Sequence, residues 1–153
     1  MNKLQQLAVD GPIACLALTY DCSAELSIGM SAATAAERTD LSSVEARAAW
    51  SPADFEASTD IDIDDIGQSR LVGQELVLLD ADDGDVAAGS EIGRRLVCAV
   101  AARLNQRDWS ATLPVTDDFV VYAVDLELVD LERNLTRCLS TDRLDQLREK
   151  GLR

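Results

Sequence analysis

The stretch that decides the fold is PIACLALTY, residues 12–20, which is apolar almost without interruption. Such a run is typical of a strand that is buried on both faces of a sheet. The next stretch, AELSIGM at residues 24–30, alternates apolar and polar side chains and follows after a gap of hairpin length. The two stretches therefore predict an antiparallel hairpin whose second strand is half exposed at an edge of the sheet.

A third strand is predicted at residues 118–126, DFVVYAVDL, because both of its alternating sets of side chains are apolar. We expect this strand at the centre of the sheet. Helices are predicted from Ser42 or Ser43 to about Trp50, over residues 90–105, after Asp130, and from Ser140 or Thr141 onward. A short helical turn is also predicted, with Ser51 as its N-cap and Pro52 as its first residue. In the 90–105 helix the apolar stripe includes Val97 and Val100, and Arg94 lies off it.

The order of these elements predicts an α+β fold, with helices packed on a small mixed or antiparallel sheet of about three to four strands. Residues 58–67 predict an acidic loop, and residues 68–79 fit a helix or, over 75–79, a strand. No linker or internal repeat divides the 153 residues. We therefore expect a single domain over residues 1–153, with residues 1–11 as a flexible N-terminal tail.

The chain has 14 Lys and Arg residues, 28 Asp and Glu residues and no histidine, which gives a net charge of -14. This balance argues against nucleic-acid binding, which needs clustered bases to neutralise phosphates. The absence of histidine excludes Ser-His-Asp and Cys-His catalysis and histidine metal ligands. The apolar runs are too short for a signal peptide or a membrane span, so we expect a cytoplasmic protein.

The four cysteines, Cys15, Cys22, Cys98 and Cys138, form no CxxC pair and so predict neither a zinc site nor a redox motif. We expect buried free thiols in a reducing compartment. Cys22, in a predicted turn, is the one candidate for a reactive thiol.

The negative charge is concentrated in residues 48–93, which hold one base and twelve acids and so account for -11 of the -14. Residues 94–153 balance ten bases against ten acids. Acids at this density repel one another and need a role, as a solubilising surface, a cation site or a surface for a basic partner. The partner hypothesis places the contact on eight aspartates: Asp60, Asp62, Asp64, Asp65, Asp80, Asp82, Asp83 and Asp85.

Such a surface would mimic the phosphates of a nucleic acid and cover a basic cleft, with electrostatic complementarity that accelerates association. The sequence therefore favours a non-enzymatic protein-binding domain, of the kind that inhibits a basic toxin as an immunity protein. The expected partner is a basic protein, with no nucleic acid, no membrane and no cofactor.

A calcium site is tested by loop spacing, and both acidic loops fail the EF-hand pattern. Counted from Asp80, Gly84 and Asp85 stand in exchanged positions; counted from Asp60, Asp65 replaces the glycine. We therefore predict no specific metal site.

Two alternative functions stay open. One is a small enzyme that uses Asp125 and Glu127 at the end of the late strand, together with a divalent cation. The other is a self-associating structural protein, in which the 24–30 edge strand or an apolar helix face forms a homodimer.

The segment WSPADFE, residues 50–56, predicts a turn that begins at Pro52, with Trp50 and Phe55 as core anchors and Asp54 as a helix-start carboxylate. With the Tyr-Asp turn after the first strand and the late DDFVVYAVDLEL, it resembles a family of uncharacterised bacterial domain-of-unknown-function proteins. The matching positions are Trp50, Pro52, Asp54, Phe55, Phe119 and Asp125. The resemblance implies a place among toxin-immunity proteins and no established activity.

Overall fold

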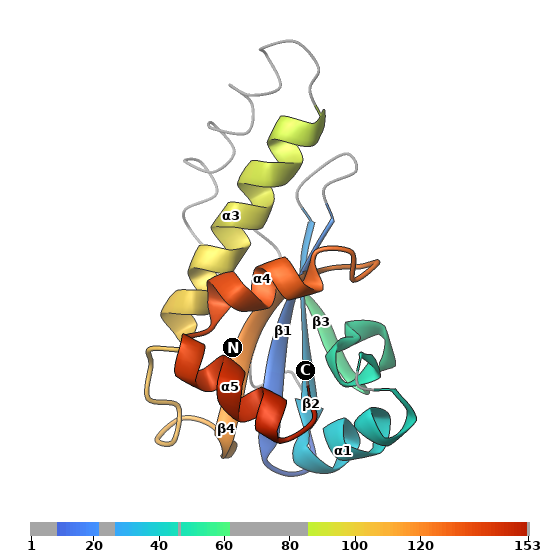
Figure 1. The fold of residues 1–153 in the computed structure, drawn as a ribbon, viewed down its shortest axis with the longest axis vertical. Coiled ribbons are helices and arrows are strands. Elements are labelled where there is room, and N and C mark those ends of the chain that lie inside the picture. Colours follow the sequence, from blue (N-terminus) through green and yellow to red (C-terminus); the bar gives the residue numbers. More distant parts are fainter. Residues whose placement is uncertain (1–8, 22–26, 46, 62–85, 153) are drawn as a thin grey trace.

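The computed structural model describes residues 9–21, 27–45, 47–61 and 86–152. Strands β1 (Ile13–Asp21) and β2 (Ser27–Thr34) pair antiparallel. Strand β3 (Ala57–Ile61) is antiparallel to β2, and β4 (Val115–Asp125) is parallel to β1. The order β3-β2-β1-β4 makes a mixed four-stranded sheet packed with helices, which confirms the predicted hairpin and the α+β class (Figure 1).

Two predicted strand positions are wrong. The second strand, β2, lies inside the sheet between β1 and β3, whereas the late strand, β4, lies at its edge. β4 is nevertheless apolar on both faces, because its residues from Val120 to Val124 are completely buried. The alternation of apolar and polar side chains along a strand indicates which of its two faces are buried, but it does not indicate whether another strand pairs with each of its edges.

Side chains cover the outer edge of β4 in place of a fifth strand. The Asn105 amide donates to the Val121 carbonyl at 2.7 Å, and its Oδ1 accepts from the Val121 N–H at 2.7 Å. Arg143 donates to the carbonyl of Asp117 at 3.2 Å. Backbone groups of a buried edge must be paired, and these two residues supply pairs that a neighbouring strand would otherwise give.

The acidic loop predicted at residues 58–67 is wrong in its first part, because Ala57–Ile61 form β3. Ala57 lies opposite Ala32 of β2, and both side chains are buried. Small side chains allow this pairing despite the polar sequence, which gave no apolar run to detect. The remaining part, together with the helix or strand predicted in residues 68–79, lies outside the described residues.

The first helix, α1 (Ala35–Val44), begins before the predicted Ser42 or Ser43 and ends before Trp50. Thr34 caps it: its hydroxyl accepts from the Glu37 N–H at 3.1 Å, and the Glu37 carboxylate accepts from the Thr34 N–H at 3.2 Å. This reciprocal capping box fixes the start of the helix directly at the end of β2.

The WSPADF segment forms two short 3-10 turns, η2 (Ala48–Trp50) and η3 (Pro52–Asp54), of which the second begins at the predicted proline. Trp50 and Phe55 are buried core residues, as predicted, whereas Asp54 is exposed. The Trp50 indole donates to the carbonyl of Leu152 at 2.6 Å, and Tyr122 donates to the carbonyl of Trp50 at 2.9 Å. Trp50 therefore joins the middle of the chain to β4 and to the C-terminal segment.

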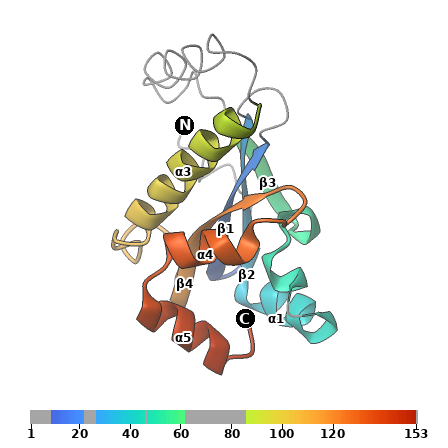
Figure 2. The ribbon, with the colours of Figure 1, turned by 45° about the horizontal axis from the view of Figure 1, so that its top comes forward.

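The later helices α3 (Val86–Leu104), α4 (Leu131–Cys138) and α5 (Thr141–Glu149) confirm the helices predicted there. α3 and α4 pack against β4 and against each other, and Figure 2 shows α4 lying across the sheet beside α3, with α5 below α4. The predicted stripe of α3 is partly wrong. Val97 is buried, but Val100 is 44% exposed and Arg94, predicted off the stripe, is only 2% exposed.

Of the predicted tail, residues 1–8 lie outside the described residues, and Val9 packs against the core.

Candidate functional site

The candidate site lies at the border of the sheet that is formed by the carboxyl ends of strands β1 and β4, and not along the side of an edge strand; "this edge" below means that border. These strands are parallel, and Tyr20 near the end of β1 stands beside Asp125, the last residue of β4. β3 runs in the same direction as β1, because both are antiparallel to β2. The carboxyl ends of three strands therefore meet at this edge, which is where sheets that contain parallel strands most often bind ligands.

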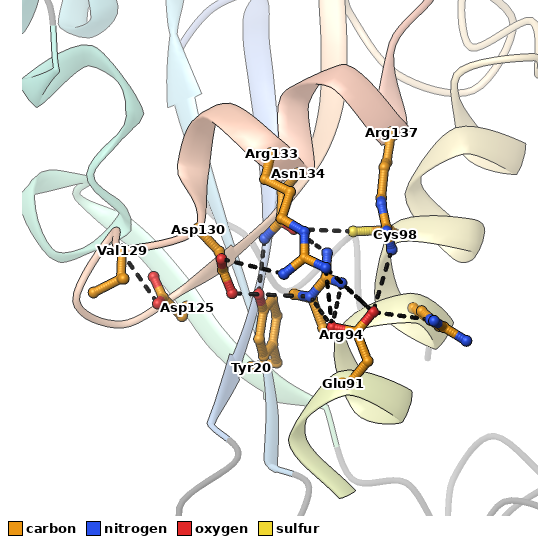
Figure 3. A network of polar contacts seen from close by, with 11 residues as sticks. Tyr20, Glu91, Arg94, Cys98, Asp125, Val129, Asp130, Arg133, Asn134 and Arg137 are labelled. Carbon is orange, nitrogen blue, oxygen red and sulfur yellow. Dashed lines mark hydrogen bonds and ion pairs between the residues drawn. The ribbon is translucent and has the colours of Figure 1, made fainter. Parts of the chain in front are cut away.

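Asn134 of α4 is the centre of the polar network behind this edge (Figure 3). Its side chain is completely buried. Its amide donates to the Tyr20 hydroxyl at 2.8 Å, and its Oδ1 accepts from Arg94 at 3.3 Å and from the Cys98 thiol at 3.4 Å. One side chain thus joins β1, α3 and α4 through hydrogen bonds that water cannot replace.

Arg94 of α3 is buried and paired. Its Nε donates to Glu91 at 3.0 Å, its Nη2 contacts both oxygens of the same carboxylate, and Asp130 lies 3.9 Å away. A buried guanidinium needs such compensation, because its transfer out of water costs several kcal/mol. Hydrogen bonds from Arg94, and then from Arg95, lower the pKa of Glu91 to about 2.

Three more arginines reach the same Glu91 carboxylate: Arg95 at 2.9 Å, Arg133 at 3.4 Å and Arg137 at 3.7 Å. They come from α3 and α4, and Figure 3 shows Arg133 and Arg137 extending from α4 toward Glu91. Unlike Arg94, they are partly exposed, with side-chain exposures of 66%, 52% and 38% respectively. We call Arg94, Arg95, Arg133 and Arg137 the arginine cluster.

Asp125, the predicted strand-end carboxylate, lies beside this network. Its Oδ2 accepts from the Val129 N–H at 3.2 Å, whereas its Oδ1 is buried and no donor among the described residues reaches it. Burial raises the pKa of Asp125 above its ordinary value, and the neighbouring Asp130 charge acts in the same direction. A carboxyl in this environment favours its protonated form more than an exposed one does.

The loop between β4 and α4 is held by the same carboxylate. Leu128 has a positive φ of 60°, unusual for a residue other than glycine, and its carbonyl accepts from Arg47 at 2.6 Å. Leu126 and Val129 on either side are 64% and 72% exposed. Glu127, the second predicted catalytic carboxylate, is also exposed and does not enter the network.

Cys15, Cys98 and Cys138 are buried free thiols, as predicted, and Cys22 lies outside the described residues. Burial raises the pKa of Cys15 to about 12. Cys98 and Cys138 contact each other across α3 and α4; a hydrogen bond from Cys138, with the nearby charges of Arg94 and Arg137, lowers the pKa of Cys98. None of the three is placed to act as an exposed nucleophile.

Most of the eight aspartates that we predict to contact a basic partner lie outside the residues that the structure describes. Asp62, Asp64, Asp65, Asp80, Asp82, Asp83 and Asp85 are outside the described residues, and Asp60 is described only as a backbone position of β3. Glu91, which the same acidic segment includes, is already paired with arginines. In the described part of the chain, no group of three or more acids or cysteines is placed to hold a metal ion.

Two surface clefts lie near the start of α5. One has a volume of about 530 Å³ and is lined by Asp118, Arg143 and Lys150 among others. The second, of about 460 Å³, is lined by Asn105, Phe119 and Arg137 among others. Neither cleft includes Asp125 or Glu127.

The residues that sequence reasoning missed are Tyr20, Arg94 and Asn134. Asn134 carried a signal, because it stands between Leu131 and Leu135 in a helix whose apolar residues face the core. A polar residue at such a position needs a buried partner. Arg94 gave no such signal, because the periodicity of the 90–105 helix places it off the apolar stripe and next to Arg95, which is indeed exposed.

Comparison with protein-family models, with curated protein sequences and with solved structures finds no match to this chain. The family resemblance carried by Trp50, Pro52, Asp54, Phe55, Phe119 and Asp125 therefore stays a prediction. In the four described ranges, no helix combines the length and the apolar character that crossing a bilayer requires.

Proposed function

We propose that this protein is a non-enzymatic domain that binds a basic protein through its acidic segment, in the manner of an immunity-type inhibitor of a basic toxin. The observation that carries the proposal is the charge division, with -11 of the net -14 in residues 48–93. Charge concentrated in this way attracts and orients a partner of opposite sign.

The fold adds a geometric argument. Seven of the eight aspartates, all except Asp60, lie in the sequence between the end of β3 at Ile61 and the start of α3 at Val86. β3 ends at the edge where β1 and β4 also end, and the first described side chains of α3, Glu91 and Arg94, contact the network at that edge. Described residues on either side of this stretch, β3 before it and Glu91 and Arg94 after it, therefore lie at this edge.

Several basic side chains of the scaffold are bound to other groups of the scaffold, and residues 48–93 keep an excess of acids. Arg47 binds the Leu128 carbonyl, Lys150 binds Asp118 at 2.6 Å, and Arg148 binds Asp145 at 2.7 Å. An excess of this kind is available to a partner, and its attraction falls as salt screens it.

The test is a salt-dependent binding measurement with matched variants. The protein is immobilised, proteins captured at low salt are eluted by high salt and identified, and each purified candidate is then titrated. Changing Asp80, Asp82, Asp83 and Asp85 to Asn should weaken binding at least about tenfold and flatten its salt dependence. The control variant changes four exposed acids outside the acidic segment to their amides: Asp40, Glu45, Asp117 and Glu149. It removes the same charge and should have little effect on binding.

Equal weakening by both sets would reduce the acidic segment to a general solubilising surface. Binding that is insensitive to salt would contradict the proposal itself.

The strand-end carboxylate enzyme is the less favoured alternative. A divalent cation needs charged carboxylates, whereas burial raises the pKa of Asp125, and the exposed Glu127 makes no contact with it in the network. Homodimerisation through residues 24–30 also loses its support, because β2 has a neighbour on each side. An apolar helix face remains open to self-association, and sedimentation velocity would measure it.

A further inference from the structure

The arginine cluster carries an inference that is independent of the acidic segment. Four guanidinium groups surround the single carboxylate of Glu91, and Asp130 is the only other acid paired with them among the described residues. Four positive and two negative charges leave two positive charges in excess. Among these paired residues the sign of the charge is therefore opposite to that of the whole chain, whose net charge is -14.

The cluster is larger than its structural task requires. Arg94 is the buried member, and its contacts with both oxygens of Glu91 already provide the paired, charge-assisted geometry that a buried guanidinium needs. Arg95, Arg133 and Arg137 add contacts of 2.9 to 3.7 Å to the same carboxylate. Exposed ion pairs of this kind add little stability, and the three cations repel one another.

The unused donors define what the cluster would bind. A guanidinium carries five N–H donors. Arg95, Arg133 and Arg137 direct few of theirs to Glu91 and keep side-chain exposures of 66%, 52% and 38%. Convergent arginines are the usual recognition element for phosphate groups, because their forked donors match the oxygens of a tetrahedral dianion. The excess of two positive charges in the cluster would balance the two negative charges of such a dianion.

We propose that the arginine cluster is a binding site for a phosphate dianion, either inorganic phosphate or a small phosphate monoester, and that the Glu91 carboxylate occupies this site as a built-in competitor. Glu91 is part of the same chain, so it competes at a high effective concentration. Its charge therefore sets the affinity of the site. Removing that charge frees Arg95, Arg133 and Arg137 for the ligand.

The test is a calorimetric titration of the whole protein with inorganic phosphate, at an ionic strength kept constant with sodium chloride. Glu91→Gln should bind phosphate at least about tenfold more tightly than the wild type. Asp145→Asn is the matched control, because Asp145 also pairs with an arginine three residues later, and no second arginine among the described residues is paired with it. This control should leave phosphate binding unchanged.

Arg133→Gln with Arg137→Gln, added to Glu91→Gln, should abolish the gain. The same pair of changes in the wild-type background leaves the Glu91–Arg94 contacts intact and should weaken phosphate binding, so it decides the question if Glu91→Gln does not fold. A parallel titration with glycerol phosphate separates the two sources, since tighter binding than inorganic phosphate identifies a monoester as the preferred ligand.

An equal gain in Asp145→Asn, no gain in Glu91→Gln, or a gain that survives the loss of Arg133 and Arg137 would each overturn the phosphate site. None of these results bears on the acidic segment, whose test uses salt-dependent protein binding.

Discussion

Two arginines are buried to the same extent in this protein, and they are compensated in different ways. Arg94 and Arg38 are each 2% exposed. Arg94 is paired with a carboxylate and an amide, whereas Arg38 donates to the Ala14 carbonyl at 3.2 Å and stacks over the Trp50 ring at 5.0 Å. Within the described part of the chain, Nε and Nη2 of Arg38 have no partner.

The comparison shows that equal burial does not mean equal function. The pairing of β1 shifts register between Ile13 and Cys15, so that Ala14 is not among the paired residues. Arg38 donates the hydrogen bond that the Ala14 carbonyl accepts there. Arg94 instead belongs to a network that joins three elements at the candidate site. Arg38 therefore satisfies one backbone carbonyl in the core, whereas Arg94 holds side chains of α3 and α4 together.

The largest expected effect comes from the centre of the Arg94 network. Asn134→Leu leaves the Tyr20 hydroxyl, one Arg94 donor and the Cys98 thiol without their partner, and should lower the free energy of unfolding by about 4 kcal/mol. Tyr20→Phe removes only one of the three contacts and should cost about 1 kcal/mol. Urea denaturation of both variants measures the difference. Equal losses would mean that Asn134 acts through the tyrosine alone.

The two arginines should differ when each is changed to methionine. Arg94→Met leaves Asn134 and Glu91 without their main donor and should cost about 3 kcal/mol. Arg38→Met loses one hydrogen bond and the contact with the Trp50 ring, but it also removes a buried charge that forms no salt bridge with a described carboxylate, so we expect a cost of about 1 kcal/mol or less. Thermal and urea unfolding give both values; the reverse order would refute the comparison.

Acid should remove the contribution of Glu91 to stability. The pKa of Glu91 is lowered from 4.5 to about 2 in the folded protein, so its contribution to stability is complete above pH 4.5 and is lost as the pH falls toward 2. Glu91→Gln should therefore show a flatter dependence of unfolding free energy on pH in this window than the wild type. Asp145→Asn again serves as the control. Parallel curves for wild type and Glu91→Gln would contradict the lowered pKa.

The smallest expected effect has the opposite sign. Because burial raises the pKa of Asp125 in the folded state, its ionisation opposes folding, and stability falls as the pH rises from 3.8 through the folded value. Asp125→Asn keeps an oxygen for the Val129 N–H and should stabilise the protein at neutral pH by less than about 1 kcal/mol. The advantage should disappear in acid, where both side chains are neutral. Destabilisation at pH 7 would indicate that the charge of Asp125 is needed.

The sequence predicted the elements that depend on side-chain periodicity. β1 and β4 were found because each is apolar on both faces, and α5 because Ser140 caps it and Gly151, with φ of 70°, ends it. The pairing of strands was not predictable in the same way. β3 has the polar sequence ASTDI and is a strand because β2 offers it a partner.

The candidate site was only partly predictable for a related reason. Asp125 was found because it ends an apolar strand, and the motif residues Trp50 and Phe55 were found as core anchors. The contacts of Arg94, Tyr20 and Asn134 join residues up to 114 positions apart in the chain. Local patterns do not encode such contacts, because they arise from packing of the finished fold.

The amide of Asn105 has a consequence for assembly. It pairs with both backbone groups of Val121 as another strand would, and so terminates the sheet on the β4 side. A strand from another chain could not pair at Val121 without displacing this amide. Asn105, together with Arg143 at the Asp117 carbonyl, thus protects part of this edge against strand addition.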